Sequence, residues 1–336
     1  MVLQGRMISS LRHALWVRRI SGCLAAVWLA LASLNSSFFS SPAHAAPGVA
    51  FGAQSVGSAP SSARPVPPVR HVPAQRLPSN SSHPPEAQSR LAVRSKIALV
   101  EDAKTSEVLL AKKADQVVPI ASITKLMTAI VALDANLPPE DMLTISDEDC
   151  DPAMGTASRL RVGWSLSRAD MLHVALMSSE NRAAAALSRY YPGGRPAFIQ
   201  AMNARAAELG MSNTHFVNPN GLTSENVSTA FDLVKLVQAA YQYPLIREYS
   251  TDRYYYVQIG RRILPYVNTN RLIGRPDWDI EVQKTGFISE SGECLVMRVN
   301  LDGRPLIMIF LDSYGKLTRF ADARRVRMQL ALAKRK

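Results

Sequence analysis

Two side chains in the stretch PIASITKLMTA, residues 119–129, could carry out nucleophilic chemistry together. The apolar spacing predicts a helix that begins near Ser122, and residues three apart on a helix lie on the same side, which would place Lys125 beside Ser122. A serine hydroxyl is a weak nucleophile at neutral pH and needs a base. A lysine, with a solution pKa of about 10.4, becomes that base only when apolar burial or a second cation lowers the pKa. We therefore expect Ser122 as nucleophile and Lys125 as base.

A second cation is available in VQKTGF, residues 282–287, which has the composition of a strand. Lys284 in the middle of an apolar strand is unusual unless it faces a cleft. Thr285 can donate a hydroxyl, and Gly286 lets a ligand backbone approach closely. The alternative is an edge-strand lysine that is followed by a turn.

A third element is the tripeptide Ser179-Glu180-Asn181, between two predicted helices. Its hydroxyl and carboxamide could relay a proton and hold a substrate amide. The same tripeptide recurs at residues 224–226, in a turn-rich loop, and helix capping could explain either copy. The Ser-x-x-Lys spacing also recurs at residues 313–316, in a glycine-containing turn. We favour residues 179–181 because helices on both sides fix their position.

The segments that must position these side chains predict mixed helices and strands. The order is strands, a helix, a helical insert, strands and a final helix, which predicts an α+β fold with an antiparallel sheet flanked by helices and an inserted all-helical subdomain. The final helix has basic residues on one face. We favour a core-packing helix with a solvated basic face over a membrane-surface helix. The predicted elements are a hairpin over 96–113, helices after 122 and within 168–191, 195–210 and 317–333, and strands at 280–287, 294–302 and 305–312.

The first ninety residues differ in composition from the rest. Four arginines without acidic residues, an apolar run over 20–34 and the small-x-small site Ala43-His44-Ala45 predict a signal peptide over 1–45. An uncleaved anchor helix is the alternative, although the run is short for a membrane span. Residues 46–90 are rich in proline, serine and alanine, which predicts a disordered linker. The folded domain is expected over 91–336.

The charge and the scarce metal-ligand residues narrow the function classes. A formal net charge of +12 suits nucleic acid, a membrane surface or an anionic polymer. No arginine-rich recognition motif or zinc-finger spacing supports nucleic acid. His173 and His215, the histidines beyond residue 90, lack zinc-ligand spacing, so we expect no metal and no cofactor. Export would permit a disulfide between Cys150 and Cys294, but two unpaired buried cysteines are slightly favoured.

Ser-x-x-Lys, Ser-x-Asn and Lys-Thr-Gly, in this order, resemble the signature of penicillin-binding proteins and class A β-lactamases. The blocks PIASITKLMTA, LMSSENRAA, FVNPNGL and STAFDLVKL look like those of the low-molecular-mass D-alanyl-D-alanine peptidases, the peptidase S11 family. VQKTGF and GKLTRFADARRVR look closest to the endopeptidase branch, the penicillin-binding protein 7 type. The resemblance covers about residues 92–330 and implies a β-lactamase/transpeptidase-like fold. The family often has a histidine where this chain has Asn226 or Val227.

The resemblance implies an acyl-transfer role for each motif. Ser122 would attack a D-alanine carbonyl, Lys125 would accept its proton, and Ser179, held beside Lys125, would protonate the leaving amine. Water would then release the acyl-enzyme.

The remaining motif residues would bind the substrate. Asn181 would hold the substrate amide, Lys284 would add a positive field, and Thr285 in its Lys-Thr-Gly run would bind a carboxylate or carbonyl. The backbone N–H groups of Ser122 and Phe287 would form the oxyanion hole.

We expect a periplasmic endopeptidase that cuts D-alanyl cross-links between peptidoglycan stem peptides and is acylated by β-lactams. Only about fifty residues follow Gly286, which leaves no room for the C-terminal domain and amphipathic anchor usual in the family's carboxypeptidases. A D-alanyl-D-alanine carboxypeptidase is the alternative. A β-lactamase or a non-catalytic peptidoglycan-binding scaffold is less favoured. Loose association with the membrane or the wall would fit the basic charge.

Overall fold

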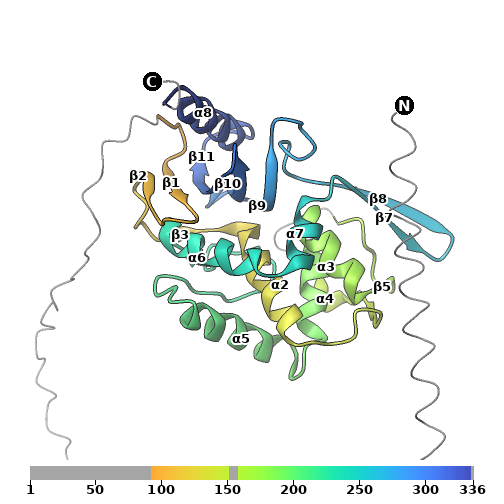
Figure 1. The fold of residues 1–336 in the computed structure, drawn as a ribbon. Helices are drawn as coiled ribbons and strands as arrows, with labels where there is room; N and C mark the ends of the chain where they lie inside the picture. Colours follow the sequence, from red (N-terminus) through yellow and green to blue (C-terminus); the bar gives the residue numbers. More distant parts are fainter. Residues whose placement is uncertain (1–91, 151–157, 334–336) are drawn as a thin grey trace, which may run out of the picture. The chain divides into compact units, whose positions relative to one another are not determined.

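The computed structural model describes residues 92–150 and 158–333 (Figure 1). The predicted signal peptide at 1–45 and the predicted linker at 46–90 lie outside the described residues.

A five-stranded antiparallel sheet forms the frame of the fold, with the strand order β2-β1-β11-β10-β9. The first and the last strand pair at its centre, where Ile97 lies opposite Leu311. The antiparallel sheet, the N-terminal hairpin and the three late strands that the sequence predicts are confirmed. The strands are β1 (Ile97–Asp102), β2 (Val108–Lys112), β9 (Asp279–Ile288), β10 (Gly292–Leu301) and β11 (Arg304–Ser313).

Both faces of the sheet are buried, because successive side chains on each strand point to opposite sides. On β11, Ile307 and Ile309 pack into the core shared with the helical insertion. Met308 and Phe310 of the same strand pack into a second core beneath α8 (Thr318–Ala333). The apolar run of β11 therefore serves two layers, as expected for a strand that is buried on both sides.

A mainly helical insertion between β2 and β9 covers one face of the sheet (Figure 1). The predicted helices are confirmed, including the pair within residues 168–191. Gly210 follows α5 with φ +69°, the left-handed conformation that commonly ends a helix. The insertion contains the 3-10 turns η1 (Ala121–Thr124) and η2 (Asp147–Asp149) and the helices α2 (Lys125–Asp134), α3 (Arg168–Met177), α4 (Asn181–Arg189), α5 (Gly194–Glu208), α6 (Ala230–Tyr241) and α7 (Pro244–Thr251).

Three short antiparallel pairs accompany the helices. They are β3 (Val118–Pro119) with β6 (Val227–Ser228), β4 (Met142–Thr144) with β5 (Ser165–Ser167), and β7 (Tyr254–Ile259) with β8 (Arg262–Val267). The β7–β8 hairpin was not predicted. Its buried side chains are few, chiefly Val257 and Tyr266, so the run lacks the apolar signal by which the other strands were found.

The final helix packs on the sheet, as predicted. Phe320, Ala323 and Val326 of α8 are buried against β10 and β11, on the face opposite the helical insertion (Figure 1). Neither α8 nor any other helix within residues 92–150 and 158–333 combines the length and apolar character that a membrane crossing requires.

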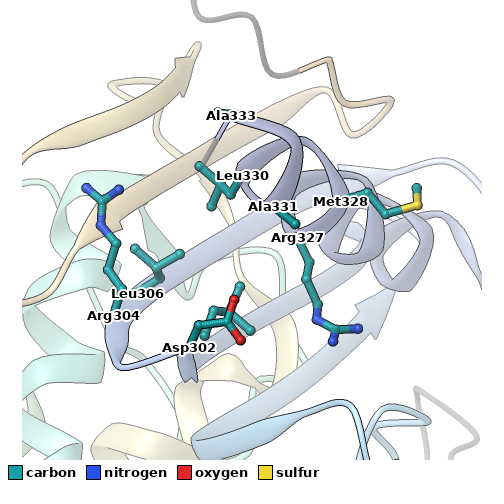
Figure 2. A pocket seen from close by; sticks show the side chains of 9 residues that line it. Asp302, Arg304, Leu306, Arg327, Met328, Leu330, Ala331 and Ala333 are labelled. Atoms are coloured by element: carbon teal, nitrogen blue, oxygen red, sulfur yellow. The ribbon is translucent and has the colours of Figure 1, made fainter. Parts of the chain in front are cut away.

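A groove of about 480 Å³ lies between the last turns of α8 and the β10–β11 turn. Leu306 and Leu330 line it, and Figure 2 shows Arg304 and Arg327 on its two sides. The groove is on the α8 side of the sheet, since Leu306 belongs to the core beneath that helix.

Both cysteines of the described residues, Cys150 and Cys294, are unpaired. Cys294 is fully buried in β10, and burial raises the pKa of its thiol to about 11. The prediction of two unpaired cysteines is therefore confirmed, although only Cys294 is buried and Cys150 is partly exposed.

A buried carboxylate joins the start of the domain to α8. Asp322 is fully buried and accepts hydrogen bonds from the backbone N–H groups of Arg94 (2.9 Å) and Ser95 (2.7 Å). The Ser95 hydroxyl donates to the same carboxylate. The segment before β1 is thereby held against α8 by charge-assisted hydrogen bonds, which are stronger than neutral ones.

Replacing Asp322 with alanine leaves buried N–H groups without an acceptor, so we expect Asp322→Ala to lower the free energy of unfolding by about 3 kcal/mol. Urea denaturation measures this loss. The matched control is Asp141→Ala, which removes a half-exposed carboxylate paired with Arg168 and should cost less than about 1 kcal/mol. Equal losses in the two variants would contradict the anchoring role of Asp322.

Candidate active site

The proposed nucleophile lies in a tight turn that leads directly into a helix. Ser122 is on the 3-10 turn η1, and Lys125 is the first residue of α2. Side chains three apart eclipse one another in a 3-10 turn, which brings the serine beneath the lysine. The preceding Ala121 has φ +47°, an uncommon conformation for a residue with a side chain.

Two glycines from distant segments make room for this turn. A β-carbon on Gly221 would lie 2.0 Å from the Ala121 carbonyl oxygen, and Gly221 also has φ +79°. A β-carbon on Gly286 would lie 3.0 Å from the Ile120 carbonyl oxygen and 3.1 Å from the Ser122 nitrogen. The close approach expected at Gly286 is thus made by the chain's own backbone, and the nucleophile turn is held between the two glycines.

The Lys125 side chain is 1% exposed, and its amine has three partners. Nζ lies 2.7 Å from Ser122 Oγ, 2.7 Å from Asn181 Oδ1 and 2.6 Å from the Asn220 carbonyl oxygen. Two of these atoms are carbonyl oxygens, which can only accept. When the amine is neutral, its two N–H groups are used by these carbonyls, and its lone pair is left for the Ser122 hydroxyl. These contacts would let a neutral Lys125 accept a proton from Ser122.

Burial lowers the pKa of Lys125 to about 7, and the negative charge of Glu180 opposes that shift. An ammonium group loses its hydration in such a site, so the neutral form gains relative stability. We had expected Lys284 to contribute to this shift. Desolvation is instead the cause that lowers the pKa of Lys125, whereas the pKa of Lys284 is lowered first by its own burial and then by the charge of Lys125.

The tripeptide Ser179-Glu180-Asn181 forms the junction of α3 and α4. Ser179 has φ +63°, and Asn181 is the first residue of α4. Glu180 is buried, caps α4 by accepting from the Arg182 N–H group, and accepts from Ser158 Oγ at 2.6 Å. These bonds hold the turn so that Asn181 Oδ1 reaches Lys125.

Lys284 enters the same site from β9. Its fully buried Nζ donates to Ser179 Oγ and to the Thr285 carbonyl oxygen, both at 2.9 Å. Burial lowers the pKa of Lys284 well below its usual value, and the charges of Lys125 and Arg319 add to the shift. The Ser179 hydroxyl, expected beside Lys125, is therefore bonded to Lys284. Each amine contacts one serine, Lys125 with Ser122 and Lys284 with Ser179.

The residues that follow Lys284 on β9 lie at the same candidate site as its amine. The Thr285 and Thr269 hydroxyl oxygens are 2.6 Å apart, and the Thr269 N–H group donates to the Met177 carbonyl oxygen. Phe287 is 58% exposed at the end of β9. The structure thus brings together segments that are more than 150 residues apart in the sequence, since Lys284 follows Lys125 by 159 positions.

One contributor was missed because it acts through the main chain. The Asn220 carbonyl oxygen bonds Lys125, and no side-chain pattern announces a backbone acceptor. The buried Asn226 holds this loop, accepting from the Val217 and Asn218 N–H groups and donating to Thr124 Oγ1. Only the block FVNPNGL pointed to the loop.

The recurring motifs lie elsewhere. In the tripeptide 224–226 Asn226 has the structural role just described. In the run 313–316 the Ser313 hydroxyl is 2.7 Å from that of Ser95, and Lys316 is exposed.

Within the described residues, no group of three or more histidine, cysteine, aspartate or glutamate side chains is arranged to hold a metal ion.

Comparison with known proteins agrees with this arrangement. The pattern of the peptidase S11 family, described as D-alanyl-D-alanine carboxypeptidase, matches residues 82–315. A D-alanyl-D-alanine endopeptidase of Pseudomonas aeruginosa is 49% identical over 257 residues, covering 75% of this chain and 82% of the relative. An endopeptidase of the same description from Escherichia coli is 47% identical over 248 residues, covering 73% of this chain and 80% of the relative.

Solved structures show the same fold. The Streptomyces K15 DD-transpeptidase superposes with a TM-score of 0.66 at 28% identity, covering 72% of this chain and 98% of that chain. Penicillin-binding protein D2 from Listeria monocytogenes, in its cefotaxime-bound form, has a TM-score of 0.64 at 29% identity, covering 73% and all of the two chains. The expected transpeptidase-like α+β fold is confirmed.

The steric role of Gly221 predicts a large loss of stability in Gly221→Ala. The new β-carbon would overlap the Ala121 carbonyl and add left-handed strain, so we expect a loss of about 3 kcal/mol or more in the free energy of unfolding. The matched control is Gly303→Ala, at φ +82° with no atom within 4 Å of the new carbon, which should lose only about 1 kcal/mol. Urea denaturation measures both losses. Similar losses in the two variants would contradict the steric role of Gly221.

Proposed function

Because the chain belongs to the peptidase S11 family of serine D-alanyl-D-alanine peptidases, we propose that it is an endopeptidase that cuts D-alanyl cross-links between peptidoglycan stem peptides. The observation that carries the proposal is the buried Lys125 amine 2.7 Å from Ser122 Oγ, with two carbonyl oxygens occupying its other positions. The endopeptidase names of the two relatives from Pseudomonas aeruginosa and Escherichia coli favour this specificity within the family.

In the proposed acylation step, Ser122 Oγ attacks the carbonyl carbon of the D-alanine residue while its proton passes to Lys125 Nζ. The carbonyl oxygen becomes an oxyanion. The backbone N–H groups of Ser122 and Phe287 would donate to it, and donors that are fixed before the reaction stabilise such a charge effectively.

Collapse of the tetrahedral intermediate requires a proton on the leaving amine. Ser179 would deliver it, since its hydroxyl accepts from Lys284, which can replace the proton that Ser179 gives to the amine. Lys125 would pass the proton taken from Ser122 to the water that enters as the amine leaves, and Lys284 would regain its proton from solvent. Water then attacks the acyl-enzyme with Lys125, again neutral, as the base.

Substrate binding would use groups that the lysines leave free. Asn181 Oδ1 accepts from Lys125, so its Nδ2 group can donate to a substrate carbonyl. The Thr285 hydroxyl, next to Thr269, would bind a substrate carboxylate or carbonyl. Lys284, in its protonated form, would add a positive field that favours anionic groups in the cleft. β-Lactams would acylate Ser122 by the same route.

We also place the enzyme in the periplasm. The support is the arginine-containing, apolar start with its small-x-small site, together with the cell-wall chemistry in the relatives' names. The net charge of +12 would favour loose association with the anionic wall polymer or the membrane surface.

The test of specificity uses two purified substrates, a cross-linked muropeptide dimer and an uncross-linked pentapeptide monomer. We expect the dimer to be converted to monomers faster than the monomer loses its terminal D-alanine, because the relatives with 47–49% identity are named endopeptidases. Separation of the products by liquid chromatography measures both rates. Loss of terminal D-alanine without dimer cleavage would assign a carboxypeptidase instead.

The nucleophile is tested with a fluorescent penicillin. Wild type should be labelled covalently and Ser122→Ala should not, because the acyl bond forms at Oγ. Thermal unfolding of the variant serves as the folding control. A folded wild-type protein that stays unlabelled would favour a non-catalytic scaffold, and rapid turnover of a chromogenic cephalosporin would favour a β-lactamase.

The pKa of Lys125 predicts a defined pH dependence of acylation. The lysine must be neutral to accept the Ser122 proton, and its pKa is about 7. We expect the acylation rate constant for a fluorescent penicillin to rise about tenfold per pH unit below 7 and to level off above it. Stopped-flow measurements from pH 5.5 to 9 would show the curve. A rate that is constant or falls with rising pH would exclude Lys125 as the base.

A further inference from the structure

The β7–β8 hairpin has one exposed and one docked face. Its outward side chains are exposed on both strands, and the large apolar ones among them have exposed fractions of 52% (Tyr254), 65% (Tyr256), 65% (Ile263) and 49% (Val267). The register pairs Tyr254 with Val267 and Tyr256 with Pro265, so these residues share one face. These five residues form what we call the outer face of the hairpin, and the hairpin itself extends away from the helices (Figure 1). Solvent-exposed aromatic side chains that are gathered on one face are typical of binding surfaces.

The opposite face holds the hairpin rigidly in place. Tyr255 packs against His173 of α3 with ring centroids 3.8 Å apart and the rings tilted by 30°, and its hydroxyl donates to Asp170. Val257 and Tyr266 are buried in the core of the insertion. The outer face is therefore presented by a fixed support, which limits the entropy lost on binding.

The outer face lies next to the candidate active site along the chain. Ile263, Pro265 and Val267 alternate along β8, and Thr269, two residues beyond the end of that strand, has its hydroxyl 2.6 Å from that of Thr285. The five residues of strand from Ile263 to Val267 span about 15 Å. Arg159 also links the two regions, since its side chain donates to the Pro265 carbonyl oxygen and its backbone N–H group donates to Glu180.

We infer that this outer face binds the glycan strand of peptidoglycan beside the stem peptide in the cleft, an inference that rests on the proposed function. A stem peptide branches from its glycan, so a sugar chain must pass within a few residues of the scissile bond. Tyrosine rings offer flat apolar surfaces for the C–H faces of pyranose rings and hydroxyls for their polar edges. The exposed Arg253 and Arg261, at the two ends of β7, would attract carboxylates of neighbouring stems.

The test measures binding without hydrolysis. In full-length protein carrying Ser122→Ala, the variant Tyr254→Ala/Tyr256→Ala should bind purified sacculi at least about tenfold more weakly in cosedimentation. Peptide-free glycan strands, released from sacculi by an amidase, should compete with the parent protein for sacculi. The matched control, Met328→Ala/Leu332→Ala on α8, removes side chains of similar exposure (59% and 60%) and should bind like the parent. Thermal unfolding confirms that each variant is folded.

Three results would overturn the inference. The tyrosine variant could bind sacculi as tightly as its parent, or glycan strands could fail to compete while free stem peptides do. Analytical ultracentrifugation could instead show that the parent self-associates and the tyrosine variant does not, which would assign the face to a second copy of the chain. Because binding is measured with the nucleophile removed, a negative result here is separate from a failure of the muropeptide assay.

Discussion

The site depends on keeping an amine uncharged where water would otherwise protonate it. Lys125 and Lys284 are both fully enclosed, and burying two ammonium groups in one place is costly unless protons are released. Burial is what favours the neutral form of Lys125, and in that form the two carbonyl oxygens take its N–H groups and leave its lone pair for Ser122. That arrangement requires α2, the α3–α4 junction, the loop at Asn220 and strand β9 to meet at one point.

The backbone in this meeting place is strained, and the rigid frame around it maintains the strain. Ala121 and Ser179 adopt positive φ angles despite their side chains. Ser179 carries one hydroxyl of the candidate site, and Ala121 precedes Ser122, which carries the other. Gly221 and Gly286 leave room for the backbone around Ala121. The frame consists of a sheet that is buried on both faces and of helices that bury apolar side chains against it. The free energy gained by this burial offsets the cost of the strained turns.

In the proposed function, the bond is cleaved in one place and the polymer is bound in another. The proposed reacting atoms lie between the helical insertion and β9, where only part of one stem peptide would need to enter. The β7–β8 hairpin leaves that junction at Thr269 and carries an exposed aromatic face away from it. An enzyme acting on a cross-linked network benefits from such an extension, because binding energy from remote parts of the substrate can orient the bond to be cleaved.

The sequence alone predicted most of the elements and the side chains that could do chemistry together. Ser122 and Lys125 are neighbours on one turn, so local geometry already pairs them, and the apolar periods of the sheet and helices are strong. Only the tertiary structure decided that Ser179 bonds Lys284 and that the Asn220 carbonyl oxygen bonds Lys125. It also decided that Gly221 and Gly286 lie on either side of the turn at Ser122. These contacts join segments far apart in the chain, partly through backbone atoms that every residue shares, so no local pattern encodes them.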